Sequence, residues 1–469
     1  MKTLAERIGD RSATVGVVGL GYVGLPLAVS FADVGFDVVG IDYSPEAIAQ
    51  LRSGDPTTGD IDPAALTAHL KAESIRLYDS YEPLETADAI CICVPTPVTE
   101  HREPDMSCVR SAAHGVAEYL GRGQLVVLES TTFPGTTDEL VRPILEATGL
   151  RVGRDFALAY SPERVDPNNR RFGLRNTPKV VGGVTAKCGD LAVLLYSQIV
   201  TEVVPVSSPR VAETAKLLEN LFRHVNIALV NELALLCDRM GLDVWEVIDA
   251  ASTKPFGFMR FEPGPGVGGH CVPVDPFYLA WKARSYGFHT RFIELASDVN
   301  TSMPRHVVQK VIEALNSRGM SLRGSQVLVL GAAYKGDIAD TRESPALRII
   351  PMLHELGAHV SYNDPHVPSL SANGWTGRSE ALTDAAVQTA DCVLVLTKHS
   401  SYDYERIAVL APLIVDTRNA LRPDAGSHVF RLAAQPAHVH AEAVAAIYER
   451  HSRPPTQPRA TRPVLAAEA

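Results

Sequence analysis

The fold of this 469-residue chain is decided by the stretch Thr14-Val15-Gly16-Val17-Val18-Gly19-Leu20-Gly21-Tyr22-Val23-Gly24-Leu25. The apolar run from Thr14 to Leu20 predicts a buried strand, and the residues from Leu25 to Val34 predict a helix. A second strand, Phe36 to Ile41, ends at Asp42, about twenty residues after the first glycine. A strand, a Gly-x-Gly-x-x-Gly turn, a helix and a strand that ends in an acid form the dinucleotide-binding fingerprint, so this region is predicted to fold as a Rossmann unit.

The same region predicts NAD rather than NADP as the cofactor. The free amides and the positive dipole at the start of the helix suit a pyrophosphate. The Asp42 carboxylate would accept hydrogen bonds from ribose hydroxyls and would repel a 2′-phosphate. The residues of this region that are predicted to contact the cofactor are Gly19, Gly21, Tyr22, Val23, Gly24 and Asp42. Later segments of the chain add Thr96, Thr131 and Arg342 to the predicted contacts.

Three further strands are predicted in the first half of the chain. They span Ala89 to Val94, Gln124 to Glu129 and Ala157 to Tyr160. Polar residues follow each strand, and the carboxyl ends of parallel strands meet at one edge of a sheet. Thr96, Thr131 and Glu163 are therefore expected at that edge.

A long helix is predicted from Val211 to Met240, where apolar residues recur at helical spacing without an internal glycine or proline. This helix is long enough to join two domains. Lys216 and Asn220 are four residues apart and share one helix face, so both could point at a common ligand. Spacing alone equally allows a solvated polar stripe.

A second α/β unit begins at the strand Gln326 to Gly331 and reaches another strand from Ala358 to Tyr362, before Asp364. It lacks the glycine fingerprint, which indicates a different ligand. Cations nearby would suit a nucleotide diphosphate, and the candidates are Lys335, Arg342 and Arg418.

Cys271 is a lone thiol behind the glycine-rich stretch Gly264 to Gly269. Oxidising an alcohol only to an aldehyde needs no nucleophile, whereas continuing to an acid requires a group that adds to the carbonyl. Cys271 is predicted to be that group, with Asp275 near it. A small buried apolar cysteine is the alternative.

Composition and charge exclude several classes of function. The net charge of -10 and the absence of a dense Lys/Arg block argue against nucleic acid or an anionic membrane as partner. The N-terminus has no signal-peptide core and no apolar run approaches a membrane span, so a cytoplasmic protein is expected. The seven scattered cysteines lack zinc-site spacing, which predicts reduced thiols and no metal. The Pro/Ala-rich end, residues 441–469, is predicted to be disordered.

Taken together, these segments resemble the nucleotide-sugar 6-dehydrogenases, the family that includes UDP-glucose dehydrogenase, from about Thr14 to about Asn419. The motifs that carry the resemblance are the Gly19–Gly24 turn, Val94-Pro95-Thr96-Pro97, Glu129-Ser130-Thr131, Ser161-Pro162-Glu163, Lys216 with Asn220, the Cys271 loop with Asp275, and Tyr334-Lys335 through Ser344.

The resemblance implies an α/β fold in which two Rossmann-like parallel-sheet domains are joined by a long central helix and a helical dimerisation region. The implied domains are residues 1–205 for NAD, residues 206–315 for the helical centre with the cysteine loop, and residues 316–440 for the UDP-sugar. A homodimer or a higher homo-oligomer is expected.

The resemblance also implies residue roles. Cys271 would be the nucleophile, Lys216 and Asn220 would surround the oxygen on C6, and Asp275 and Thr131 would hold a catalytic water with Glu163 beside them. Either Lys216 or Asp275, working through water, would take the first proton. The implied substrate-binding residues are Glu163, Lys216, Asn220, Arg260, Gly268, Lys335 and Arg418.

Three stretches resemble the branch of the family that acts on UDP-N-acetylhexosamines: Thr99 to Ser107, Lys254-Pro255-Phe256-Gly257-Phe258, and His270 to Leu279. UDP-N-acetylglucosamine is the first expected substrate, and UDP-glucose, UDP-N-acetylgalactosamine and UDP-N-acetylmannosamine are the alternatives. More distant alternatives are a two-electron hydroxy-acid dehydrogenase and a non-catalytic NAD-binding protein, neither of which accounts for the second α/β unit together with the residues around Cys271.

Overall fold

The computed structural model describes residues 2–56, 61–99, 102–166, 169, 171–269 and 271–434. The chain forms two compact units, Met1–Val225 with His270–Leu295 and Asn226–Gly269 with Ala296–Ala469. His270, residues 100 and 101 of the quoted motif and the tail at residues 441–469 lie outside the described residues. Among the helices of the described residues, none is long and apolar enough to cross a membrane.

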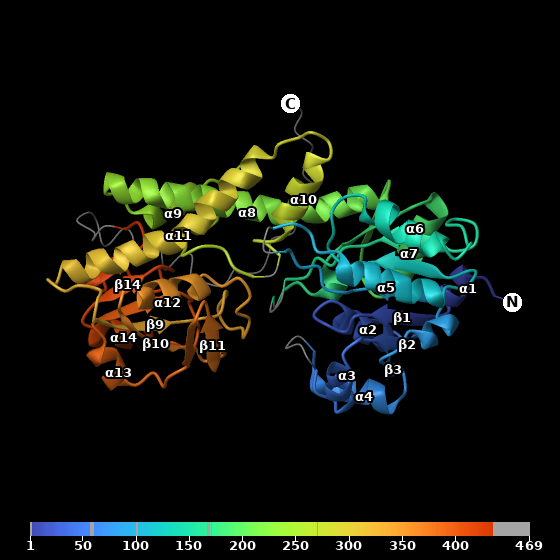
Figure 1. Cartoon of the computed structure of the whole chain (residues 1–469), viewed down its shortest axis with the longest axis horizontal. Helices are drawn as coiled ribbons and strands as arrows, with labels where there is room; N and C mark the ends of the chain where they lie inside the picture. Colours follow the sequence, from blue (N-terminus) through green and yellow to red (C-terminus); the bar gives the residue numbers. More distant parts are fainter. Residues whose placement is uncertain are drawn as a thin grey trace. The chain divides into compact units, whose positions relative to one another are not determined.

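The first unit is built on an eight-stranded sheet with the order β3-β2-β1-β4-β5-β6-β7-β8. Figure 1 labels three neighbouring strands of this sheet, β1, β2 and β3. All neighbouring strands are parallel except β6 and β7, which are antiparallel. The strands are β1 (Thr14–Val18), β2 (Asp37–Ile41), β3 (Ile75–Tyr78), β4 (Ala89–Ile92), β5 (Leu125–Leu128), β6 (Ala157–Tyr160), β7 (Lys179–Gly183) and β8 (Val203–Val206). Chain order reverses at β1, which pairs with both β2 and β4 and thereby creates the crevice that dinucleotides use in such sheets.

Helices cover both faces of this sheet because alternate residues of each strand point to opposite sides. Val15 and Val17 of β1 belong to the apolar core on the side of α1, α2, α3, α4 and α7, whereas Val18 belongs to the core on the side of α5 and α6. The helices are α1 (Leu4–Gly9), α2 (Gly24–Asp33), α3 (Pro45–Arg52), α4 (Pro63–Lys71), α5 (Ser107–Glu118), α6 (Arg142–Glu146) and α7 (Ala186–Tyr196), with short turns η1 (Glu82–Thr86), η2 (Thr137–Val141, a π-helix) and η3 (Leu174–Asn176).

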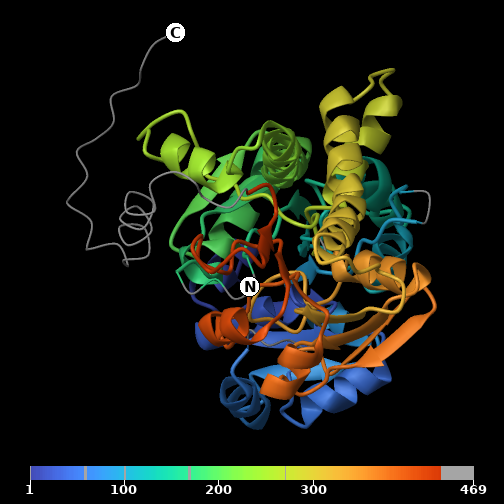
Figure 2. The ribbon, with the colours of Figure 1, turned by 90° about the vertical axis from the view of Figure 1, so that its left-hand side faces the viewer.

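Four helices follow the first sheet: α8 (Pro209–Met240), α9 (Val244–Ser252), α10 (Asp275–Arg284) and α11 (Arg291–Asn316). The predicted long helix is therefore confirmed as α8, which begins in the first unit and ends in the second. Asp243 caps α9 through the amide of Trp245, at 2.9 Å. The chain turns back between α10 and α11, in yellow in Figure 2.

The second unit contains a fully parallel five-stranded sheet with the order β10-β9-β13-β14-β15. Val327 and Val329 pack on the side of α11 and α12, and Leu328 and Leu330 on the side of α13 and α14. The elements are β9 (Gln326–Leu330), α12 (Ala346–Glu355), β10 (His359–Asn363), the antiparallel pair β11 (Ser369–Ala372) and β12 (Trp375–Arg378), α13 (Asp384–Thr389), β13 (Cys392–Val395), α14 (Tyr404–Leu410), β14 (Ile414–Asp416) and β15 (Val429–Arg431). The predicted fold class, two parallel α/β sheets joined through a long helix, is confirmed.

Candidate active site

The three glycines of the turn after β1 differ in the space around their Cβ positions. Gly19 has a φ of 91° and a Cβ there would lie 2.7 Å from the Cys93 carbonyl oxygen, while a Cβ on Gly24 would lie 1.8 Å from the Gly19 oxygen. Gly21, by contrast, has nothing within 4 Å of its Cβ position. The outer glycines therefore let the chain pack on itself, and Gly21 leaves open space that a pyrophosphate can approach.

Asp42 and the start of α2 complete this end of the sheet. One Asp42 carboxylate oxygen accepts from the Leu20 amide at 2.9 Å, and the other accepts from the Ser44 amide at 3.1 Å. Val23 precedes α2 and has no side-chain group that could cap the helix. The Leu25 amide donates to the Gly21 carbonyl at 3.1 Å, and Pro26 has no amide hydrogen. An approaching anion therefore meets the open space at Gly21 and the positive end of the helix dipole. Tyr22 is exposed beside them, and Thr96 is buried just after β4. These residues fit the cofactor that the sequence predicts.

Lys216 and Asn220 both lie on a buried face of α8, so they are not part of a solvated polar stripe. Asn220 Nδ2 donates to Asp275 Oδ2, and Arg223 Nη2 donates to Asn220 Oδ1. Burial raises the pKa of Asp275 to about 6, although Lys216, the Asn220 amide and Arg223 favour its charged form. A carboxyl with this pKa can exchange protons near neutral pH.

Cys271 is partly buried and lies four residues before Asp275, the first residue of α10. Its carbonyl oxygen accepts from the amides of Val274 and Asp275, at 3.1 and 2.9 Å, so the nucleophile candidate and Asp275 belong to the same tight turn. His224 is buried on α8, and burial lowers its pKa to about 4 despite a hydrogen bond with the Val272 backbone. His224 is therefore neutral at physiological pH.

Glu163 follows β6, and its Oε1 accepts from the amides of Arg164 and Val165 at 2.7 and 2.8 Å. Its Oε2 lies 3.5 Å from Lys179 Nζ. Burial opposes ionisation of Glu163, but Lys179, the two amides and Lys216 outweigh burial and hold its pKa below the usual value. Glu163 is accordingly a carboxylate at neutral pH.

Thr131 is partly buried after β5, and a carboxylate from α8 anchors the loop that follows it. Glu213 Oε2 accepts from the Gly135 amide at 2.6 Å, and its Oε1 accepts from the amide and the hydroxyl of Thr137 at 2.9 and 2.7 Å. Because Glu213 lies one helical turn before Lys216, a single helix fixes both the loop and the lysine.

Four residues around the site had no role predicted from the sequence, although one of them, Glu129, stands in a quoted motif. Arg223 and Glu213 stand three residues from Asn220 and Lys216 on α8, so helical spacing was a signal that could have found them. The signal from Lys179 and Glu129 was weaker. Each is an isolated charge beside an apolar strand, Lys179 at its start and Glu129 at its end, and each has its partner far along the chain.

In the second unit, the glycine-rich loop, the segment after β9 and Arg418 lie together. A Cβ on Gly268 would come within 2.6 Å of Tyr334 Cβ, directly before Lys335. A Cβ on Gly264 would lie 2.7 Å from Arg418 Nη1. Arg418 Nε donates to the Leu396 carbonyl at 2.9 Å, and burial lowers the pKa of Arg418 to about 10. The predicted substrate residues Gly268, Lys335 and Arg418 are thus gathered in one region.

Two predicted site residues of the second unit carry local ion pairs. Arg260 is exposed and pairs with Asp249 and, at 3.1 Å, with Glu262. Arg342, predicted to contact the cofactor, pairs with Asp340 at 2.6 Å, and its carbonyl accepts from the Gly269 amide at 2.9 Å. Arg342 belongs to a different unit from the glycine fingerprint.

Asp337, His366 and His399 offer ligand atoms within 4.8 Å of one another in the second unit. However, the buried His399 already uses both ring nitrogens: Nδ1 accepts from the Asp337 amide at 3.0 Å, and Nε2 lies 3.1 Å from Asp364 Oδ2. Asp364 in turn accepts from the amides of Ala332 and Ala333. His399 is therefore suited to fixing the loop that carries Lys335 rather than to binding a metal.

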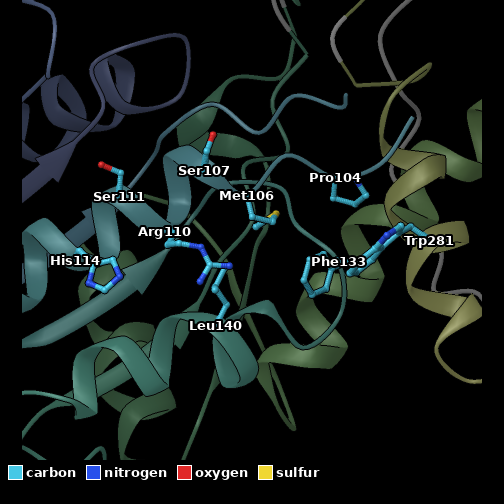
Figure 3. Close-up of a pocket in the computed structure, with 9 residues that line it drawn as sticks. All are labelled: Pro104, Met106, Ser107, Arg110, Ser111, His114, Phe133, Leu140 and Trp281. Atoms are coloured by element: carbon cyan, nitrogen blue, oxygen red, sulfur yellow. The ribbon is translucent and has the colours of Figure 1, made fainter. Parts of the chain in front are cut away.

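The first unit also contains a cavity of about 590 Å³ beside α5 (Figure 3). Its walls include Arg110 and His114 of α5 and an aromatic pair, Phe133 and Trp281, whose ring centroids are 4.9 Å apart. The predicted cofactor, catalytic and substrate residues are not among the nine that line it.

Family models match three successive parts of the chain. The NAD binding domain of the UDP-glucose/GDP-mannose dehydrogenase family matches residues 13–200, the central domain matches residues 210–302, and the UDP binding domain matches residues 328–423.

Known proteins resemble the chain over most of its length. UDP-N-acetyl-D-glucosamine 6-dehydrogenase of Pseudomonas aeruginosa is 39% identical over 360 residues, covering 76% of this chain and 84% of that protein. UDP-N-acetyl-D-mannosamine dehydrogenase of Pyrococcus horikoshii is 37% identical over 426 residues, covering 89% and 98%. A solved structure of the UDP-D-ManNAc dehydrogenase from Pyrococcus horikoshii has a TM-score of 0.82 at 35% identity and covers 90% of this chain and 100% of that one. The chain belongs to the UDP-glucose/GDP-mannose dehydrogenase family and is an NAD-dependent nucleotide-sugar 6-dehydrogenase.

Proposed function

We propose that the chain oxidises the C6 hydroxyl of a UDP-N-acetylhexosamine, with UDP-N-acetylglucosamine as the first candidate, to the corresponding uronic acid. The observation that carries this proposal is the buried group formed by Lys216, Asn220 and Asp275 next to Cys271. The names of the Pseudomonas and Pyrococcus relatives support an N-acetylhexosamine. UDP-N-acetylmannosamine, UDP-N-acetylgalactosamine and UDP-glucose are the alternatives.

The first oxidation produces an aldehyde at C6. NAD, when bound at the glycine turn, accepts one hydride in each of the two oxidations. Lys216 and Asn220 place a cation and an amide donor in a buried site, where they stabilise an alkoxide as the hydroxyl proton leaves. Lys216 or Asp275, acting through water, receives that proton.

The second oxidation requires Cys271. Its thiolate sulfur forms a bond to the aldehyde carbon, and the resulting thiohemiacetal loses a hydride to become a thioester. Water then adds to the thioester, the carbon–sulfur bond breaks, and the thiolate and the carboxylic acid are released. Glu163 and Asp275 are the carboxyl groups proposed to take the proton of that water, and Thr131 is proposed to hold the water.

The test is the amount of NADH formed per sugar consumed by the purified protein with excess NAD and limiting UDP-sugar. UDP-N-acetylglucosamine, UDP-N-acetylmannosamine, UDP-N-acetylgalactosamine and UDP-glucose are compared in parallel. Two NADH per sugar with an N-acetylhexosamine supports the proposal, and the largest kcat/KM identifies the substrate. One NADH per sugar would mean that oxidation stops at the aldehyde, and activity on UDP-glucose alone would contradict the assigned sugar.

Replacing Asp42 with asparagine should raise the preference for NADP over NAD by about 10-fold, because it removes a charge that repels the 2′-phosphate. Asparagine keeps one oxygen that can accept from the Leu20 amide, but its amide nitrogen cannot accept from the Ser44 amide, so the turn retains one of its two hydrogen bonds. The measurement is the ratio of kcat/KM values for the two cofactors. Asp37→Asn, an exposed change at the start of the same strand, is the control, and an equal ratio in both variants would contradict the assigned role.

We also propose a homodimer that uses α8. An exposed apolar stripe runs along this helix at intervals of four and seven residues, which places its members on one side. It consists of Val211, Leu218, Phe222, Leu229, Leu236 and Met240. Light scattering should give twice the mass of one chain, and Leu229→Glu should shift that mass toward the monomer. A wild-type monomer at micromolar concentration would contradict the proposal. To reach a substrate across a subunit boundary, Arg260 would have to give up its ion pairs with Asp249 and Glu262.

A further inference from the structure

The ammonium group of Lys179 is buried in the first unit between two glutamate carboxylates. Lys179 Nζ lies 2.8 Å from Glu129 Oε2 and 3.5 Å from Glu163 Oε2. Only 3% of the Lys179 side chain and none of the Glu129 side chain is exposed. The three residues stand at the ends of neighbouring strands, Glu129 after β5, Glu163 after β6 and Lys179 at the start of β7. One buried cation is therefore shared by two acids.

The two carboxylates have different supports. Glu163 is also fixed by the backbone amides of Arg164 and Val165. Glu129 instead accepts a hydrogen bond from the Tyr196 hydroxyl, and the ring of that tyrosine lies 4.9 Å from Lys179 Nζ. The positive charge that balances Glu129 thus comes from Lys179. When both acids are charged, Glu129 and Glu163 compete for this lysine.

Other charges reach Glu163 from α8. Lys216 favours its charged form. Burial, and after it the charge of Glu163, raise the pKa of Glu129, so the two acids oppose each other's ionisation. The guanidinium of Arg164 is directed elsewhere, because it pairs with Glu219 at 2.7 Å and donates to the Pro178 carbonyl at 2.6 Å. Lys179 is the cation that contacts both acids.

We propose that Lys179 is a positioning residue that keeps Glu163 ionised and aimed for hydrolysis of the thioester on Cys271. This inference rests on the proposed function. If Lys179 only stabilised the fold, a buried ion pair with Glu129 alone would be enough, and an apolar pair could often replace it without loss. The second carboxylate makes the difference: of the groups that lower the pKa of Glu163, Lys179 acts most strongly, so without Lys179 the pKa of Glu163 would rise.

The test compares the pH dependence of acid formation in Lys179→Met and in the wild type, together with the mass of acid-quenched enzyme. In Lys179→Met, the pH at which the rate of thioester hydrolysis rises should be at least about one unit higher than in the wild type. Below that pH, a larger fraction of the enzyme should carry the thioester. Lys179→Arg should restore the wild-type position. The first oxidation, followed in single-turnover NADH formation, should keep its pH dependence.

Glu129→Gln provides the opposite test. It removes the competing carboxylate but keeps the lysine, so the rise of the hydrolysis rate should move to lower pH. It also guards against a Lys179→Met protein that does not fold. The matched control is Lys282→Met, which removes another buried lysine that pairs with a glutamate, at 2.6 Å from Glu139. Its hydrolysis should keep the wild-type pH dependence.

The outcomes separate the inference from the function on which it rests. If the wild type forms no uronic acid from a UDP-sugar, the proposed function fails and the inference fails with it. If the wild type forms the acid and neither Lys179→Met nor Glu129→Gln moves the pH dependence, the inference alone is overturned, and Lys179 serves only to stabilise the sheet. Shifts in opposite directions in the two variants establish the positioning role.

Discussion

Replacing Cys271 with serine is expected to lower formation of the uronic acid by at least about 10³-fold. A serine hydroxyl is a far weaker nucleophile than a thiolate at neutral pH, and the ester that it would form hydrolyses less readily than a thioester. The Lys216 and Asn220 side chains that stabilise the alkoxide remain in place, so the first oxidation should survive in a single turnover. Mass spectrometry of the products and of the quenched enzyme measures both steps.

The control for this variant is Cys108→Ser. Cys108, like Cys271, is partly buried, whereas the other five cysteines are buried. It lies on α5, and its replacement should leave the amount of NADH per sugar unchanged. Binding of the UDP-sugar to Cys271→Ser, measured by calorimetry, shows whether the variant retains its site. Uronic acid made at the wild-type rate by a variant that binds normally would rule out the covalent mechanism.

Asp275→Asn is expected to lower turnover by about 10² to 10³-fold while making the protein more stable above pH 6. The loss of turnover follows from removing a carboxyl that exchanges protons near neutral pH. The gain in stability follows from burial, because a charged Asp275 is unfavourable in the folded protein and asparagine keeps a similar shape. An asparagine oxygen can still accept from Asn220 Nδ2.

The sign of the stability effect depends on pH. The pKa of Asp275 is about 6 in the folded protein, against 3.8 for a carboxyl of aspartate that is exposed to water. The folded wild type therefore binds more protons between these pH values and loses stability as pH rises through them. Removing the carboxyl should therefore stabilise the protein by up to about 3 kcal/mol above pH 6, and this gain should disappear below pH 4.

Thermal midpoints at pH 4 and pH 7.5 check this prediction, with activity measured on the same samples. Asp190→Asn, on the exposed side of α7, is the control and should show no pH-dependent gain. A lower midpoint for Asp275→Asn at pH 7.5 would contradict the assignment of a destabilising buried charge. Full activity would remove Asp275 from the proposed chemistry.

The parts of the fold that depend on local patterns could be predicted from the sequence. The strand Ala157–Tyr160 has the predicted ends, and α8 begins two residues before the predicted Val211 and ends at the predicted Met240. Other strands end earlier than predicted: β4 stops at Ile92 although Cys93 and Val94 are apolar. Apolar character indicates burial, whereas the end of a strand is set by where its partner strands stop pairing.

The site could be predicted only in part. Helical spacing placed Lys216 and Asn220 on one face but could not tell whether that face was buried, because burial depends on the elements that pack against the helix. The contact of Lys179 with Glu129 joins residues fifty positions apart, and no local pattern in the sequence encodes it. Such pairings arise only when the strands of the sheet take their order.

Four side chains along α8, Glu213, Lys216, Asn220 and Arg223, recur at intervals of three and four residues, so one side of a single helix serves the loop after Thr131 and the carboxylate of Asp275 together. Each residue added to an α-helix turns all that follows by about 100°. A one-residue insertion between Glu213 and Arg223 would turn every α8 side chain that follows it away from its partner, whatever residue is inserted. The length of this segment of α8 is therefore fixed by geometry.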